Sequence, residues 1–184
     1  LSNKGCYTEV RTMALDLASI LNREALALEE AGATFIQFDE PAILKYKEDF
    51  PILYEASRIL TRGLRAKTEV CTYFKDVSGI HLQFFQLPFQ VFGLDFAAGQ
   101  GNYELLKDFP RDKELAAGIM DARNTRLETV GELGKAISRV TRYVSRDRLH
   151  VSPSCGLEFL PRLTAQAKLA RLVEAAKKAE EVLQ

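Results

Sequence analysis

The chain has 184 residues, of which 47% are hydrophobic and 27% are charged, and this composition is ordinary for a globular protein with a sizeable core. Twenty-five basic residues balance twenty-five acidic ones, so no overall field favours nucleic acid or an anionic membrane surface as a partner. The best candidate for a membrane span, residues 80–99, is interrupted by glutamine, proline and aspartate, which argues against a span.

The cysteines indicate the redox setting. Cys6, Cys71 and Cys155 are too few and too widely spaced to form a disulfide framework. The first ten residues also lack the apolar core and the cleavage site of a secretory signal peptide. We therefore expect a reduced, cytoplasmic setting.

Helical and strand patterns alternate along the chain. From Thr8 to Ala31 apolar residues recur at helical spacing, and they are expected to face the core: Val10, Met13, Leu17, Ile20, Leu21 and Leu28. A second helix is expected from Pro51, which suits a first helical turn, to about Gly63. Short apolar runs predict five strands, at residues 34–38, 67–74, 91–96, 115–121 and 148–152.

Two later helices have their own signals. Thr129 and Glu132 form a Thr-x-x-Glu capping box, and the helix that it opens keeps apolar residues on one face as far as Val144. The last helix is predicted over residues 164–183, with four residues facing inward: Leu169, Leu172, Val173 and Ala176.

The order of these elements predicts an α/β fold. Each predicted strand is almost continuously apolar, and the crossovers are roughly 20 to 30 residues long, which implies a parallel sheet covered by helices. Two architectures remain open: a doubly wound open sheet and a (β/α)8 barrel of TIM type. A complete barrel needs about 250 residues and eight strands, so this chain would be the C-terminal part of one. We expect a single α/β domain over residues 1–184, an incomplete TIM-type barrel whose open edges something must cover.

Acids and thiols close the predicted strands, where parallel α/β folds place their active sites. The residues at these strand ends are Asp39 and Glu40, Glu69 and Cys71, Asp95, Asp121, and Cys155. Such a rim suits a metal or a cationic ligand. Cys71 and Cys155 with an acidic partner would make a zinc site that activates a thiol, because zinc accepts thiolate and carboxylate ligands. The alternative is that both cysteines are small buried residues, as free cysteines usually are.

A densely charged segment follows the fourth predicted strand directly. It contains Asp121, Arg123, Asn124 and Arg126, which are costly to bury without partners. We expect this segment to line the site.

Five segments, in this order and spacing, resemble the cobalamin-independent methionine synthase family: FIQFDEPAI, EVCTYF, FGLDFA, GIMDARNTRLETVGEL and HVSPSCGLEFLPR. The likeness runs from about Leu15 to the end, and it is strongest for the Asp-Glu-Pro-Ala and Cys-Gly-Leu motifs. The family uses (β/α) barrels, so the resemblance implies the fourth to eighth strands of one barrel. The first three strands have no counterpart here.

The resemblance also implies a ligand set for zinc. The family holds zinc with a His-x-Cys pair, a glutamate and a later cysteine; Cys71 and Cys155 fall on the cysteines, Glu69 on the histidine and Asp95 on the glutamate. Asp39 would bind the amino group of homocysteine. The motifs CTYF, LDF and DARN are closer to the duplicated, non-catalytic barrel of the family, which has lost zinc and helps to hold folate.

Two functional hypotheses follow. In the first, the chain is a methyltransferase that moves a methyl group from methyl-folate or a methylated corrinoid to homocysteine on zinc. Its metal ligands are Glu69, Cys71, Asp95 and Cys155, and its substrate-binding residues are Asp39, Glu40, Asp121, Arg123 and Asn124. In the second, the chain is a zinc-free barrel module that binds a folate or a partner subunit. Self-association or a missing N-terminal barrel half would cover the open edges.

Overall fold

The five strands form one parallel sheet in which each strand lies beside the next strand of the chain. They are β1 (Phe35–Asp39), β2 (Lys67–Thr72), β3 (Val91–Asp95), β4 (Glu114–Met120) and β5 (Leu149–Pro153). A doubly wound sheet reverses its strand order at a switch point, whereas the order β1-β2-β3-β4-β5 is the winding of a barrel. The prediction of a partial barrel is therefore confirmed, and the doubly wound alternative is wrong.

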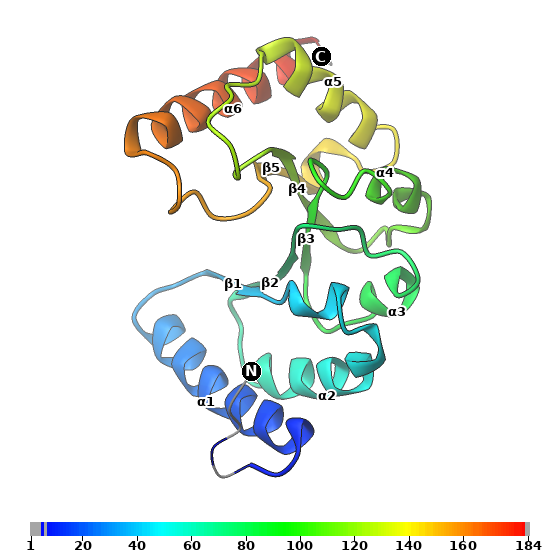
Figure 1. Ribbon diagram of the computed structural model, residues 1–184, viewed down its shortest axis with the longest axis vertical. Helices are drawn as coiled ribbons and strands as arrows, with labels where there is room; N and C mark the ends of the chain where they lie inside the picture. The colour runs from blue at the N-terminus through cyan, green and yellow to red at the C-terminus, as the bar shows by residue number, and fades with distance from the viewer. Residues whose placement is uncertain (1–4, 6, 183–184) are drawn as a thin grey trace.

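The helices lie on the outer side of the curved sheet in this computed structural model, which describes residues 5 and 7–182 (Figure 1). They are α1 (Val10–Glu30), α2 (Phe50–Leu60), α3 (His81–Phe84), α4 (Asn102–Leu105), α5 (Val130–Val140) and α6 (Arg162–Val182). Short 3-10 turns occupy Ala42–Leu44, Lys47–Asp49, Leu106–Asp108 and Arg146–Arg148. None of the helices in these described residues combines the length and apolar character needed to cross a bilayer.

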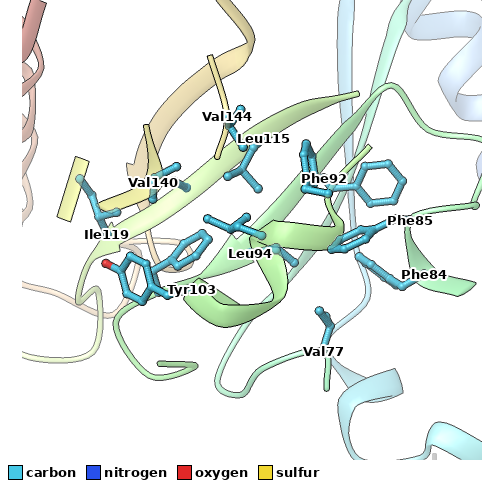
Figure 2. Packing of buried hydrophobic residues seen from close by; sticks show 14 of the residues in the cluster. Val77, Phe84, Phe85, Phe92, Leu94, Tyr103, Leu115, Ile119, Val140 and Val144 are labelled. Carbon is cyan, nitrogen blue, oxygen red and sulfur yellow. The ribbon is translucent and has the colours of Figure 1, made fainter. Parts of the chain in front are cut away.

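The hydrophobic core lies between the outer face of the sheet and the helices. Phe92 on β3 is its centre, because its ring meets those of Phe84 and Phe85 edge to face at 5.4 and 5.7 Å between centroids (Figure 2). Leu94 and Leu115 are buried beside it. Such aromatic pairs add specific geometry to the stabilisation that comes from burial.

The inner face of the sheet carries a polar network. Because side chains alternate between the faces of a strand, Lys67, Glu69 and Cys71 of β2 share the inner face. Glu114, at the start of β4, accepts hydrogen bonds from Lys67 Nζ at 2.6 Å and pairs with His150 Nε2 at 2.7 Å. This network joins β2, β4 and β5 across the interior of the partial barrel.

The predicted orientation of α1 is wrong in part. Its buried residues are Met13, Ala18 and Ala25, while most of the larger residues expected in the core are exposed: Val10, Leu17, Ile20, Leu21 and Leu28. Asn22 donates to the Leu60 carbonyl at 2.8 Å, which marks the face that meets α2. Ala25 packs with Ile36 of β1 and with Ala66, and the larger side chains form an apolar stripe on the surface of α1.

Two other helical predictions have mixed outcomes. The capping box of α5 is confirmed, since Thr129 Oγ1 accepts from Glu132 N at 3.1 Å and a Glu132 carboxylate oxygen accepts from Thr129 N at 2.7 Å. On α6, Leu172 is buried as predicted, but Leu169 and Val173 are exposed. The reason is that α6 is rotated so that Lys168, Leu172 and Ala175 face inward.

Candidate functional site

The sheet register brings the predicted strand-end residues to one rim. Asp39 of β1 lies opposite Cys71 of β2, and Cys71 lies opposite Gly93 of β3. Asp95 of β3 lies opposite Gly118 of β4. Parallel strands end at the same edge, so the acids and thiols that close them become neighbours.

Glu69 and Cys71 lean over the same glycine of the next strand. A Cβ atom built on Gly93 would lie 2.5 Å from Glu69 Oε1 and 2.7 Å from Cys71 Sγ, far inside van der Waals contact. Any other residue at this position would displace both side chains. Gly93 therefore makes room for a carboxylate and a thiol to converge on the inner face, and the sequence motif had not singled it out.

Burial, with nearby negative groups, sets the protonation of this pair. Burial raises the pKa of the Cys71 thiol, and the nearby Glu69 and Asp39 raise it further. Burial likewise raises the pKa of Glu69 to about 7, with His150 opposing the effect and Asp39 adding to it. The Cys71 thiol therefore favours its neutral form and Glu69 is protonated more readily than an exposed carboxyl group, whereas a bound divalent metal ion would favour the ionised forms of both.

Asp95 is fully buried, and its carboxylate holds the backbone that follows β2 and β3. Asp95 Oδ1 accepts from Ala97 N and Ala98 N at 2.8 Å each, and Asp95 Oδ2 accepts from Phe74 N at 2.9 Å. Phe74 has a φ of 79°, which makes it the non-glycine residue of the described chain in the left-handed region. Strained backbone of this kind persists where the surroundings fix it, often at functional sites.

Cys155 lies after β5, half-buried, within electrostatic reach of β3 and of the charged segment after β4. Burial raises the pKa of its thiol; the hydrogen bond with Ser154 and the positive charge of Arg123 lower it, while Asp95 raises it. The Arg123 guanidinium also lies over the Phe74 ring, 5.9 Å from its centroid. Arg123 thus connects the Cys155 side of the rim with the strained residue after β2.

The segment after β4 folds around Asp121. Asp121 Oδ1 accepts from Arg123 N at 2.9 Å and from Arg123 Nε at 3.0 Å, and Asp121 Oδ2 accepts from Asn124 Nδ2 at 2.8 Å. Burial opposes ionisation of Asp121, but the bonds from Arg123 more than offset it and lower the pKa. Arg126 N donates to Asn124 Oδ1, and the Arg126 side chain bonds to Glu132 on α5. Of the segment, Arg123 reaches the rim most directly.

The two acids after β1 have different environments. Asp39 is exposed and accepts from Gln37 Nε2 at 2.7 Å, so it remains accessible at the rim. Glu40 turns toward the next 3-10 turn, where Glu40 Oε1 accepts from Ile43 N at 3.3 Å. Burial raises the pKa of Glu40. Its contacts are those of a residue that caps a turn.

Sequence reasoning did not identify Tyr73 and Glu158 as rim residues. Burial raises the pKa of the Tyr73 hydroxyl to about 12, and Asp39, Cys71 and Cys155 add to the shift. Glu158 acts on both Tyr73 and Cys155, and it folds back over Gly156. The alternation Lys67, Glu69, Cys71 extends to position 73 and was a usable signal, whereas Glu158 lies in an irregular segment without one.

No three His, Cys, Asp or Glu side chains of residues 5 and 7–182 come close enough together to hold a metal ion in this arrangement. The predicted ligands are nevertheless neighbours at one rim, since Glu69, Asp95 and Cys155 all raise the pKa of Cys71. The predicted ligand set therefore remains a proposal.

The comparisons with known proteins decide the family. The family model described as "Cobalamin-independent synthase, Catalytic domain" matches residues 7–178. The chain belongs to this family. It is 35% identical over 170 residues to the methionine synthase of Pyrococcus abyssi, covering 92% of this chain and 50% of that protein. It is 36% identical over 180 residues to the methionine synthase of Saccharolobus solfataricus, covering 96% and 54%.

Solved structures support the same fold. A B12-independent methionine synthase from Shewanella sp. W3-18-1, in complex with selenomethionine, matches with a TM-score of 0.88 and 23% identity. The match covers 97% of this chain and 57% of that one. The chain thus spans about half the length of the curated relatives that it matches.

Proposed function

We propose that the chain carries the homocysteine-activating rim of a methionine synthase-type methyltransferase. The observation that carries this proposal is the convergence of Glu69 and Cys71 over Gly93. The methionine synthases among its relatives support the same reaction class. The description of the family as cobalamin-independent favours a methyl-folate donor over a methylated corrinoid.

The chemistry of the rim fits zinc through Glu69, Cys71 and Cys155. Two free thiols and a buried carboxylate are ligands that zinc accepts, and a cation would offset the burial and the nearby negative charges that keep Cys71 neutral. Asp95 fits less well, because its two oxygens already accept three backbone N–H groups. We keep Asp95 as the fourth proposed ligand, through its remaining lone pairs. When bound, zinc supplies a Lewis acid that keeps a substrate thiol deprotonated near neutral pH.

The other rim residues bind and orient the substrate. The exposed carboxylate of Asp39, beside Cys71, attracts the ammonium group of homocysteine. Bonds to Asp121 use two of the five N–H donors of the Arg123 side chain, so the guanidinium can also bind the substrate carboxylate. Glu40 and Asn124 support the substrate-binding residues without contacting the substrate. Glu40 holds the turn after β1, and Asn124 holds the Asp121 carboxylate. The thiolate sulfur then attacks the methyl carbon in line with the bond to the donor, which breaks as the S–C bond forms.

A second candidate function is a zinc-free barrel module that binds a folate or a partner subunit. The hydrogen bonds that occupy the Asp95 carboxylate favour it, because a carboxylate committed to backbone N–H groups has less need of a metal. In this function the two cysteines would be remnants of a metal site.

We further propose that additional barrel units complete the site. Among the described strands, β1 and β5 each pair with one neighbour, so each has an edge of unpaired backbone groups. The exposed stripe on α1 offers an apolar surface at one of these ends. An N-terminal barrel half or a second copy of the chain would cover both, in keeping with the half-length match to the relatives.

Elemental analysis of the purified chain tests this proposal. We expect about one zinc per chain, and its loss in Cys71→Ser and in Cys155→Ser. Cys6→Ser, which changes the cysteine outside the described residues, is the matched control and should keep the metal. Homocysteine should bind to the zinc-loaded chain in calorimetry. A folded wild-type chain without zinc that still binds a folate would instead support the barrel module.

A further inference from the structure

A buried ion pair connects α6 with the segment after β4. Lys168 on α6 has an exposed fraction of 0%, and Glu128 has one of 7%. Lys168 Nζ donates to Glu128 Oε2 at 2.9 Å. Neither residue belongs to the rim, so the pair needs an explanation other than contact with a substrate.

Both partners also hold the backbone of the residue that closes β4. Lys168 Nζ donates to the Asp121 carbonyl at 2.9 Å, and Asp121 N donates to Glu128 Oε1 at 3.1 Å. These two bonds and the ion pair form a closed ring. The next amide, Ala122 N, donates to Ser154 Oγ at 3.1 Å, beside Cys155. The main chain at 121–122 is thus held by α6, by the segment before α5 and by the residues after β5.

The energetics of such a pair favour a role in positioning. Burying two charges costs several kcal/mol per ion before their attraction is counted, and replacing a buried pair by neutral residues of similar size is often neutral or stabilising. A pair of this kind therefore adds little net stability. Here the pair fixes the position of the Asp121 backbone, because the Lys168 ammonium bonds to the Asp121 carbonyl and the Glu128 carboxylate bonds to the Asp121 N–H.

The consequence reaches Arg123, two residues further along the chain. Its side chain is bound to the Asp121 carboxylate and lies over the Phe74 ring, so its place at the rim depends on where the Asp121 backbone is held. We propose that Lys168 and Glu128 are positioning residues that aim Arg123 at the carboxylate of an amino-acid thiol bound at the rim. This inference rests on the proposed function for the identity of that ligand, but not for the placement of the segment.

The test uses the full chain with Lys168→Met combined with Glu128→Gln, which removes both charges and nearly keeps both shapes. The matched control is Lys178→Met with Glu174→Gln, an exposed pair on the same helix with an N–O distance of 3.1 Å. Hydrogen exchange at 120–125 should become at least tenfold faster in the first variant. It should stay unchanged in the control, and both variants should keep the thermal midpoint within a few degrees.

The binding of two thiols then distinguishes a specific effect on the placement of Arg123 from a general loosening of the rim. By calorimetry, the Lys168→Met, Glu128→Gln variant should bind homocysteine at least fivefold more weakly, but bind 3-aminopropane-1-thiol, which lacks the carboxylate, as the wild type does. Equal loss for both thiols, or unchanged exchange at 120–125, would overturn the inference. If the double variant does not fold, Lys168→Arg is measured in the same way, and loss of homocysteine binding without loss of the amine is again expected. If the wild type binds neither thiol, the proposed function fails, and exchange at 120–125 alone decides whether the pair places the segment.

Discussion

The ring of Phe35, on β1, meets the ring of His150, on β5, edge to face with 6.3 Å between centroids. These strands are the first and last of a five-stranded sheet, so the sheet must curl for the two rings to touch. The contact lies at the end of the inner face where β1 and β2 begin, beside the Lys67–Glu114–His150 network. Contacts between side chains on the inner face therefore help to hold the curvature of the sheet, in addition to the helices packed on its outer face.

Phe35→Ala should weaken this curvature. The ring is 42% exposed, so its removal should lower the free energy of unfolding by only about 1 kcal/mol, the value of one aromatic contact with partial burial. A double-mutant cycle with His150→Ala, measured by urea unfolding, should give a coupling energy of about 0.5 kcal/mol or more. Strictly additive effects would show that the two rings do not support each other.

Glu69→Gln should change how stability depends on pH. The pKa of Glu69 is raised from 4.5 to about 7, so the folded protein binds this proton more tightly than the unfolded chain does. The protonated state therefore contributes stability that is complete below about pH 4.5 and is lost as the pH rises to about 7. Without metal, we expect the wild type to lose roughly 3 kcal/mol more than Glu69→Gln across this window. Urea unfolding in a chelator at pH 4.5 and pH 8 measures the difference, and parallel pH profiles would contradict it.

Gly93→Ala should disrupt the rim while leaving the fold intact. The added methyl group collides with Glu69 Oε1 and Cys71 Sγ, so we expect a loss of about 1 to 3 kcal/mol and at least tenfold weaker zinc binding. Gly134→Ala on α5 is the control, because its Cβ would meet nothing within 4 Å. The control should be stabilised by about 0.5 to 1 kcal/mol, since alanine is the better helix former. Unchanged zinc binding in Gly93→Ala would separate this glycine from the metal site.

Asp95→Asn tests whether Asp95 binds zinc or only holds the backbone N–H groups that follow β2 and β3. An amide keeps one acceptor but directs an NH2 group at a backbone N–H, so unfolding should become easier by about 1 to 3 kcal/mol. The exposed Asp112→Asn is the control and should change stability by less than about 0.5 kcal/mol. If zinc stoichiometry falls in Asp95→Asn at a temperature where it remains folded, Asp95 is also a ligand. Retained zinc would leave the holding of these N–H groups as its sole role.

Thr129→Ala tests the capping box of α5. Thr129 and Glu132 satisfy each other's backbone N–H groups, and loss of such a cap costs about 1 kcal/mol. The exposed Thr125→Ala, four residues earlier, should have little effect. Thermal unfolding followed by circular dichroism measures both, and an equal effect of the two changes would mean that the cap adds no stability.

All five strands were predictable from the sequence to within about two residues. Buried parallel strands are continuous apolar runs between polar turns, and the runs at 34–38 and 91–96 have no competing reading as long helices. The closeness of Asp39, Cys71 and Asp95 was also predictable, because the ends of parallel strands share an edge. Family resemblance supplied the roles that periodicity could not.

The features that escaped prediction depend on partners that are distant in the sequence. On helix α1 Ala18 and Ala25 are buried while most of the larger apolar residues are exposed, and part of this choice depends on Ile36 and Ala66, which pack against Ala25. Lys168 is a lysine in a helix rich in charge, which normally indicates a solvated face. Its burial requires Glu128 and the Asp121 carbonyl, 40 and 47 residues away.

The two faces of this one sheet should tolerate substitution in opposite ways over evolutionary time. On the outer face, Phe92, Leu94 and Leu115 belong to the hydrophobic core, so they can be replaced one at a time by residues of similar volume. On the inner face, Glu114 forms hydrogen bonds with both Lys67 and His150, so a change at one of the three residues removes a partner from another. In related sequences, residues on the outer face of the sheet should therefore change independently, whereas Lys67, Glu114 and His150 on the inner face should change together.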